Sequence, residues 1–211
     1  MEIDMAQMGR PRTFDRQQAI RQAMQLFWEQ GYESTSLAQL KACMGGGISA
    51  PSFYAAFGSK EALFEEVVQC YVENYARVTD CLWDDGIPPR DAVELALRRS
   101  AKMQCEPGHP KGCMVALGVM SAPTPEHAHV AKPLAVSRAR TFAGFIRCVE
   151  RGIAMGELAE DANARAIGNA FNSFLLGVSI SIRDGVKLPT INASITQMMT
   201  LWDTCKSQPV G

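Results

Sequence analysis

Apolar residues recur along most of the chain at intervals of three and four positions, which places them on one face of an α-helix. The first such stretch begins near Asp15, and Gly31 follows it. Its apolar positions in helical register are Ile20, Ala23, Met24 and Phe27. Because glycine readily adopts the left-handed conformation that ends a helix, we predict a first helix over residues 15–30.

A capping pattern marks a short second helix. Ser36 precedes Gln39 by three positions, which is the spacing of a capping box, so a helix is expected over residues 36–44. Three consecutive glycines at 45–47 then predict a turn.

The third predicted helix, over residues 49–56, has an unusual distribution of side-chain sizes. Ser49 is suited to the N-cap, and Pro51 is tolerated in the first turn, where its missing N–H has no helical partner to lose. The first turn is therefore small and polar, while Phe53 and Phe57 provide apolar surface for packing against the two preceding helices. Two helices joined by a glycine turn and braced by a third predict a helix-turn-helix, whose second helix enters the major groove of DNA.

The rest of the chain is also predicted to be helical. Ser59 is a candidate cap for a long fourth helix, whose apolar stripe continues to about Trp83. Later helices are expected at 90–105, 112–121, 126–155, 161–184 and 190–205, separated by segments rich in proline and glycine. No strand pattern is evident, so the predicted fold is all-α with about nine helices.

Composition indicates a globular protein. Of the 211 residues, 47% are hydrophobic and 20% are charged, and no apolar run approaches the roughly 20 residues that cross a bilayer. No secretory leader is evident, so we expect a cytoplasmic protein without a membrane partner. The seven cysteines are an odd number without a CxxC spacing, which favours reduced thiols.

The charge is distributed unevenly. Residues 9–60 hold six Lys or Arg against three acids, a net charge of +3, whereas the whole chain has a net charge of −1. A basic N-terminal part on an acidic body is typical of a protein that presents one face to nucleic acid.

Several local motifs together resemble the DNA-binding domain of the TetR family of transcriptional regulators. The similarity covers residues 9–68 and includes an arginine-bearing arm, the stretch LFWEQGY, the Thr-Ser cap, the aromatic third helix and the boundary stretch FGSKEAL. It implies a helix-turn-helix domain over 1–60, joined by a long helix to a helical domain over 61–211 that binds an effector and dimerises. The family's majority function, repression released by a small molecule, is the expected one, and neither a cofactor nor a metal is expected.

The resemblance also implies which residues contact operator DNA. Ser49, Ala50, Pro51 and Ser52 are expected to face the major groove. Phosphate contacts are expected from Tyr54 and Lys60 and from the helix start at Thr35 and Ser36, and the arm residues Arg10 and Arg12 are expected to lie along the backbone or enter a minor groove. The triple glycine makes the turn about two residues longer than in many members, which changes the expected angle of the third helix.

The resemblance further implies a dimer formed by the last two helices and an effector pocket among the helices before them. Two recognition helices must reach half-sites separated by about 34–36 Å or a multiple of that distance, so a homodimer is expected. The candidate dimer residues are Phe171, Leu175, Val178, Ile182, Ile195, Met198, Met199 and Trp202. The candidate pocket residues are Met103, Cys113, Met114, Leu117, Met120, Phe142, Phe145, Ile146, Phe171 and Phe174. Both sets have the pattern of an ordinary helical core.

The segment from Cys105 through His109 to Cys113 leaves two further hypotheses open. Its two cysteine side chains and its histidine side chain are ligand types that suit Zn(II) or Cu(I). Glycine and two prolines in the segment prevent these side chains from lining one regular helical face. Alternatively, Cys113 at a helix start is a candidate sensor of oxidants or electrophiles. A thiol-dependent enzyme with His109 as its base is a weaker hypothesis, because no nucleophile elbow, nucleotide loop or HExxH motif accompanies it.

Overall fold

The computed structural model describes residues 14–118 and 129–206. Those residues form nine α-helices, the 3-10 helix η1 and a further 3-10 turn at 129–131, without a strand, so the predicted all-α fold is confirmed. The elements are α1 (Arg16–Ser34), α2 (Leu37–Cys43), α3 (Ala50–Phe57), α4 (Lys60–Asn74), η1 (Ala76–Trp83), α5 (Pro89–Cys105), α6 (Met114–Leu117), α7 (Lys132–Ala154), α8 (Ala164–Arg183) and α9 (Leu188–Thr204). The predicted sites Arg10, Arg12 and Met120 lie outside the described residues.

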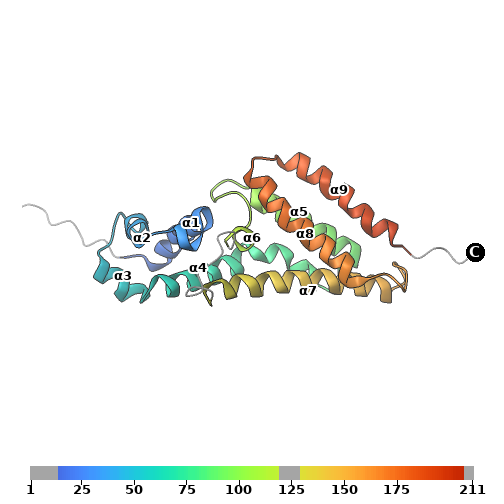
Figure 1. The fold of residues 1–211 in the computed structure, drawn as a ribbon, viewed down its shortest axis with the longest axis horizontal. Helices are drawn as coiled ribbons and strands as arrows, with labels where there is room; N and C mark the ends of the chain where they lie inside the picture. Colours follow the sequence, from blue (N-terminus) through green and yellow to red (C-terminus); the bar gives the residue numbers. More distant parts are fainter. Residues whose placement is uncertain (1–13, 119–128, 207–211) are drawn as a thin grey trace, which may run out of the picture.

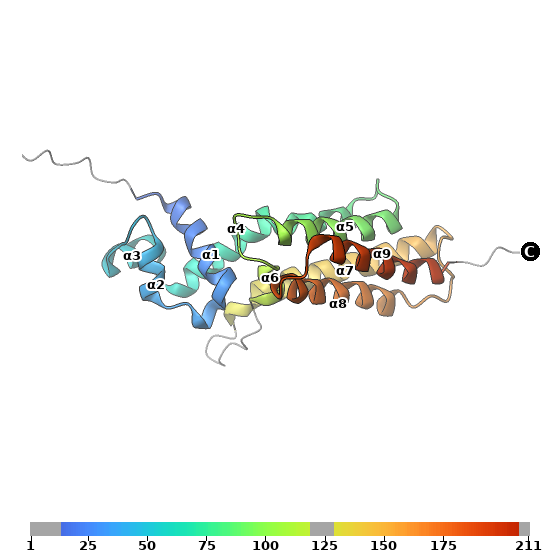
Figure 2. The same cartoon turned by 90° about the horizontal axis from the view of Figure 1, so that it is seen from above.

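The molecule is elongated. Helices α1, α2 and α3 form one end, and α4 runs from them along the same side as α7 towards the body made by α5, α7, α8 and α9 (Figures 1 and 2). The caps predicted for the second and third helices are confirmed, because the side chains of Ser36 and Ser49 accept hydrogen bonds from backbone N–H groups of the first turns. Asp15 caps α1 in the same way. Gly31 has a φ of +79° and breaks α1, as its position after the apolar stripe predicts.

The fourth helix is shorter than the sequence pattern predicts. Regular α-helix ends at Asn74, and the continuation to Trp83 is the 3-10 helix η1. Within it the hydroxyl of Thr79 donates to the carbonyl oxygen of Ala76 at 3.1 Å, a local side-chain bond to the residue three positions earlier. Such bonds compete with regular α-helical geometry, whereas the apolar spacing that suggested one helix is also compatible with tighter turns.

Two other predicted helices also differ from the expected bounds. The helix expected over 112–121 is the single turn α6, ending at Leu117, and the helix expected from residue 126 begins as α7 at Lys132. Pro133 lies in the first turn of α7, a position where its missing N–H costs no hydrogen bond. Apolar spacing alone did not locate this start, which Pro133 marks.

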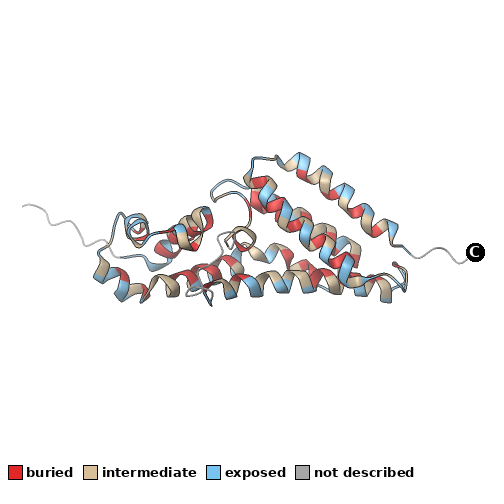
Figure 3. Ribbon diagram, in the orientation of Figure 1, coloured by how far each residue is buried: buried red, intermediate tan, exposed pale blue. Residues whose placement is uncertain are grey.

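Two hydrophobic clusters stabilise the fold. The first joins α1, α2, α3 and α4 to residues of α6 and the start of α7, and includes the fully buried rings of Phe27, Trp28 and Phe53. The second lies among α5, α7, α8 and α9 around Phe145 and Trp202. Figure 3 shows buried positions along the facing sides of these helices and exposed positions along their outer sides.

The dimer residues predicted from the sequence belong to this second cluster, so most of them are already packed within the single chain. Phe171, Leu175, Val178, Ile182, Ile195, Met199 and Trp202 are all buried within the single chain, and only Met198 is partly exposed. The most apolar face of each helix packs against the neighbouring helices of its own chain. Gly168 of α8 lies against α7, since a Cβ there would be 2.8 Å from Cγ1 of Ile146.

Candidate nucleic-acid interface and effector chamber

Residues 49–52, which we call the leading edge, lie at the start of α3. Ser49, Pro51 and Ser52 are exposed and Ala50 is partly exposed. The Ser49 hydroxyl accepts from the backbone N–H of Ser52 at 3.2 Å, and the two hydroxyl oxygens are 2.8 Å apart. The leading edge is therefore small, polar and accessible, as the sequence predicts.

The opposite side of α3 is anchored in the first cluster. Phe53 and Phe57 are buried at 0% and 4% exposure, and their rings are 5.5 Å apart. Arg16 of α1 reinforces this packing, because its Nε donates to the carbonyl oxygen of Ala56 at 3.3 Å and its Nη2 pairs with Glu66 at 2.6 Å. Helix α3 is therefore anchored through its buried face, while its first turn remains exposed.

The turn before α3 uses the conformational freedom of its glycines. Gly45, Gly46 and Gly47 all have positive φ angles, from 58° to 110°, which side chains other than glycine rarely adopt. The turn is closed by a hydrogen bond from the N–H of Ile48 to the carbonyl oxygen of Lys41 at 3.0 Å. The triple glycine is thus a defined connection that sets the position of α3 relative to α2.

The predicted phosphate contacts divide into exposed and buried residues. Tyr54 is 51% exposed and Ser36 is exposed at the capping box that starts α2, so both are accessible. Thr35 is fully buried, and its hydroxyl donates to the carbonyl oxygen of Gly31 at 2.7 Å, at the broken end of α1. The expected contact at this position is with the helix start, and the Thr35 side chain is occupied within the domain.

Lys60 is partly buried rather than fully exposed. Its ammonium lies 4.2 Å from the centre of the Tyr32 ring, a cation–π contact. Burial lowers the pKa of Lys60, while Glu33 and Glu61 act in the opposite direction. In this conformation the ammonium packs on the N-terminal domain, so a phosphate contact requires the side chain to turn outward.

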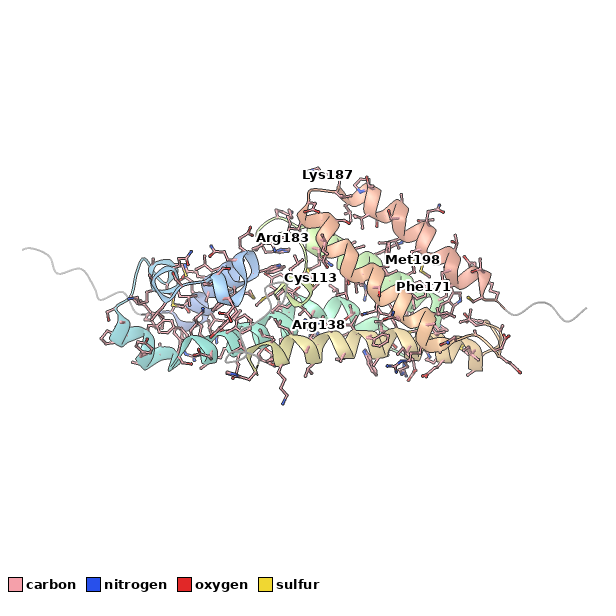
Figure 4. All side chains as sticks on the ribbon, viewed as in Figure 1. Cys113, Arg138, Phe171, Arg183, Lys187 and Met198 are labelled. Carbon is pink, nitrogen blue, oxygen red and sulfur yellow. The ribbon has the colours of Figure 1, made fainter. Side chains whose placement is uncertain are left out.

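A narrow cavity of about 50 Å³, which we call the chamber, lies where η1, α5, α6, α7 and α8 meet. The surface that lines it is mainly apolar, and the lining residues include Met103 and Cys113 from the predicted pocket set. The polar lining residues, none of them among the predicted set, are Tyr71, Thr79, Ser100, Gln104, Ser137, Arg138, Thr141, Asn172 and Ser179. Figure 4 shows Cys113 and Arg138 near the middle of the molecule, beside the junction of its two parts.

The other predicted pocket residues do not line the chamber. Met114, Phe145 and Phe171 are fully buried core residues, and the last two stack on each other with ring centres 6.1 Å apart. Leu117 lines a separate hollow beside Trp28. Phe142, Ile146 and Phe174 are partly buried but are not among the lining residues. Apolar periodicity selected core residues, whereas the chamber is distinguished by polar groups that have no periodic signal.

The cysteine and histidine of the 105–113 segment do not converge. The His109 ring stacks on Trp28 at 4.4 Å, and its Nδ1 is 2.8 Å from the carbonyl oxygen of Pro110. The Sγ of Cys113 instead accepts from the Tyr71 hydroxyl at 3.3 Å. Over residues 14–118 and 129–206, no group of three or more His, Cys, Asp or Glu side chains is placed to hold a metal ion. His109 is thus not positioned as a base for Cys113.

Comparison with known proteins extends these observations beyond the N-terminal domain. The family model described as "Bacterial regulatory proteins, tetR family" matches residues 19–67, which span α1, α2, α3 and the first half of α4. The HTH-type transcriptional repressor ComR of Escherichia coli (strain K12) is 30% identical over 198 residues, covering 92% of this chain and 91% of ComR. The chain belongs to the TetR family.

Two further relatives resemble this TetR-family chain. The HTH-type transcriptional repressor BdcR of Escherichia coli (strain K12) is 40% identical over 114 residues, covering 54% of the chain and 56% of BdcR. A solved structure of a cysteine mutant of the TetR family transcriptional regulator CifR, complexed with 26 bp double-strand operator DNA, is 36% identical with a TM-score of 0.81. That comparison covers 92% of this chain and all of the CifR chain.

The described helices of this TetR-family chain include none that is long and apolar enough to cross a membrane.

Proposed function

We propose that the protein is a homodimeric repressor that binds a palindromic operator and is released from it by a small-molecule effector. The exposed leading edge carries this proposal, because a small first turn presented on a rigid base is what a major groove admits. The likeness to ComR, BdcR and the operator-bound CifR supports it.

In this proposal the leading edge enters the groove and neighbouring groups bind the backbone. Tyr54 and Ser36, both exposed, are the proposed phosphate contacts, joined by Lys60 once its side chain turns outward and by Arg10 and Arg12 of the N-terminal arm. The leading edge carries no arginine or amide for bidentate base contacts, so sequence discrimination rests on van der Waals fit, water and DNA shape.

The proposed dimer surface is the outer side of α8 and α9. Residues 172–182 of α8 and 188–202 of α9 contain no charged side chain. On α8, Ser173, Gly177 and Ile180 are exposed at helical spacing, and a Cβ on Gly177 would meet nothing within 4 Å. This outer face is small and uncharged, so it allows the close approach of a second copy.

Replacing Ile180 with glutamate is expected to convert the dimer to monomer and to weaken operator binding, because two charges would then be buried against each other in a symmetric interface. Ile180 is 44% exposed in the single chain, so folding should be little affected. Sedimentation equilibrium measures the mass, and a gel shift measures DNA affinity. Met155→Glu is the matched control, since Met155 is 61% exposed at the far end of α7. An unchanged dimer in Ile180→Glu would contradict the proposed surface.

The chamber is linked to the DNA-binding domain by the 106–113 loop. Cys113 lines the chamber, and the adjacent carbonyl oxygen of Gly112 accepts from Nε1 of Trp28 in α1 at 3.0 Å. A Cβ on Gly112 would lie 2.8 Å from the carbonyl oxygen of Ser179 in α8, so the loop is closely packed on both sides. We infer that an effector in the chamber shifts this loop and thereby α1, which changes the separation of the recognition helices.

A second candidate function is sensing of oxidants or electrophiles by Cys113 through the same switch. The Cys113 thiol borders the chamber and accepts a hydrogen bond from the Tyr71 hydroxyl. Modification of the thiol would therefore alter the loop that contacts α1. Cys113→Ser is expected to abolish any release from DNA by hydrogen peroxide while leaving DNA affinity unchanged, as measured by gel shift. Release that persists in Cys113→Ser would end this second proposal, and Cys70→Ser serves as the control thiol.

A further inference from the structure

The chamber lies next to a larger groove on the surface. A hollow of about 560 Å³ between α4, η1 and α7, which we call the outer groove, shares Ala76, Thr79, Ser137 and Thr141 with the chamber lining. The chamber alone, at about 50 Å³, has room for a small group of atoms rather than a whole drug-sized molecule. A ligand of moderate size would therefore place one part in the chamber and the remainder towards the groove.

Two buried polar atoms in the chamber have no hydrogen-bond partner in the described parts of the chain. Ser100 and Gln104 lie one turn apart on α5 with 2% and 1% exposure, and the unpartnered atoms are the Ser100 Oγ and the Gln104 Oε1. A buried acceptor without a partner is unfavourable, and a ligand that donates a hydrogen bond to it removes that cost.

Arg138 supplies a positive charge to the same chamber. Its Nη1 donates to the carbonyl oxygen of Val115 at 2.8 Å, and no carboxylate of residues 14–118 or 129–206 forms an ion pair with it. Burial lowers the pKa of Arg138, so its surroundings penalise the cation. Arg140, two positions further along α7, is by contrast paired with Asp80 at 2.9 Å.

We propose that the effector is a small organic carboxylate that also carries a hydroxyl group. Its carboxylate pairs with Arg138, its hydroxyl donates to Gln104 beside Ser100, and the apolar lining holds the atoms between them. This inference rests on the proposed function, since it names the class of effector for the same chamber. Guanidinium and carboxylate form charge-assisted hydrogen bonds, which are stronger than neutral ones.

The test compares matched ligands on the full-length protein without DNA. Titration calorimetry uses 4-hydroxybenzoate, benzoate, 3-hydroxybutyrate and the neutral 4-hydroxybenzamide. We expect 4-hydroxybenzoate to bind about tenfold or more tightly than either benzoate or the amide, because each of these lacks one of the two polar interactions. Both hydroxy acids are expected to bind. The proposal is overturned if neither does at millimolar concentration, or if the amide matches the acid.

Variants then assign the two ends of the ligand. Arg138→Gln is expected to remove the preference for acid over amide, and Gln104→Met to remove the preference for 4-hydroxybenzoate over benzoate. Arg99→Gln, an exposed arginine on α5, is the charge-matched control. Preferences that survive in both chamber variants overturn the assignment, and the comparison of ligands on the unaltered protein does not depend on either variant folding.

The outcome for the proposed function is read separately. A hydroxy acid that binds in the calorimeter but does not release the protein from its operator in a gel shift contradicts effector-controlled repression while leaving the chamber chemistry intact. If the protein binds its operator and is released from it by other compounds, but has no affinity for the hydroxy acids, the proposed regulatory function is supported. The proposal of a carboxylate effector is then refuted.

Discussion

Replacing Ser52 with glutamate is expected to lower affinity for operator DNA by roughly 100-fold or more. Ser52 is exposed in the first turn of α3, and its hydroxyl contacts that of Ser49. A carboxylate there would be repelled by phosphates, and its bulk would hold the leading edge away from base edges. Because the proposed dimer carries two leading edges, the loss is expected twice in each complex.

A quantitative gel shift over a series of salt concentrations measures this effect. Ser52→Glu should retain the melting temperature of the unaltered protein, since the side chain points into solvent. Ala143→Glu introduces the same charge at an exposed position of α7 and should reduce affinity only slightly. If the two variants bound DNA equally well, the leading edge would not be the contact surface.

Replacing Trp28 with alanine is expected to destabilise the N-terminal domain by about 3–5 kcal/mol, the usual cost of removing a buried tryptophan. Trp28 is 1% exposed and contacts Tyr71 at a ring separation of 4.8 Å. Its indole N–H bonds the loop at Gly112, and its carbonyl oxygen accepts from Arg183 of α8 at 3.3 Å. The side chain therefore joins α1 to α4 and to the loop, while its backbone holds α8.

Scanning calorimetry tests this expectation. Loss of Trp28 should split unfolding into an earlier transition of the N-terminal domain and a later one of the helical body. Trp83→Ala, at a site 38% exposed, should cost much less. Trp28→Phe keeps most of the packing but leaves the buried Gly112 carbonyl oxygen without its hydrogen-bond donor. The free energy of unfolding is expected to fall by about 1–3 kcal/mol as a result. If Trp28→Ala lowered the melting temperature no more than Trp83→Ala, the proposed role of Trp28 in joining α1 to α4 and the loop would be contradicted.

The local features of the N-terminal domain were predictable because each depends on a few adjacent residues. Three such features lie within one or two helical turns, and the structure confirms each of them. They are the capping box of Ser36 and Gln39, the helix break at Gly31, and the small first turn of α3 before Phe53. The role of the Thr35 side chain was not predictable, because its hydroxyl satisfies a carbonyl oxygen left by the break at Gly31.

The proposed effector and dimer sites were much less predictable because they depend on which face of each helix turns inward. Phe171 and Ile195 share the periodic spacing of interface residues and of core residues, and both lie in the core. The chamber is distinguished by Gln104 and Arg138, polar residues brought together from α5 and α7. Only the tertiary packing of those helices makes them neighbours.

The most direct test of the account is a hydroxyl-radical footprint on a DNA fragment that the protein selects from a random pool. We predict two symmetric protected regions whose centres are about 34–36 Å apart or a whole-number multiple of that, one for each leading edge of a dimer. A single protected region, or no selection of sequence from the pool, would contradict the central claim.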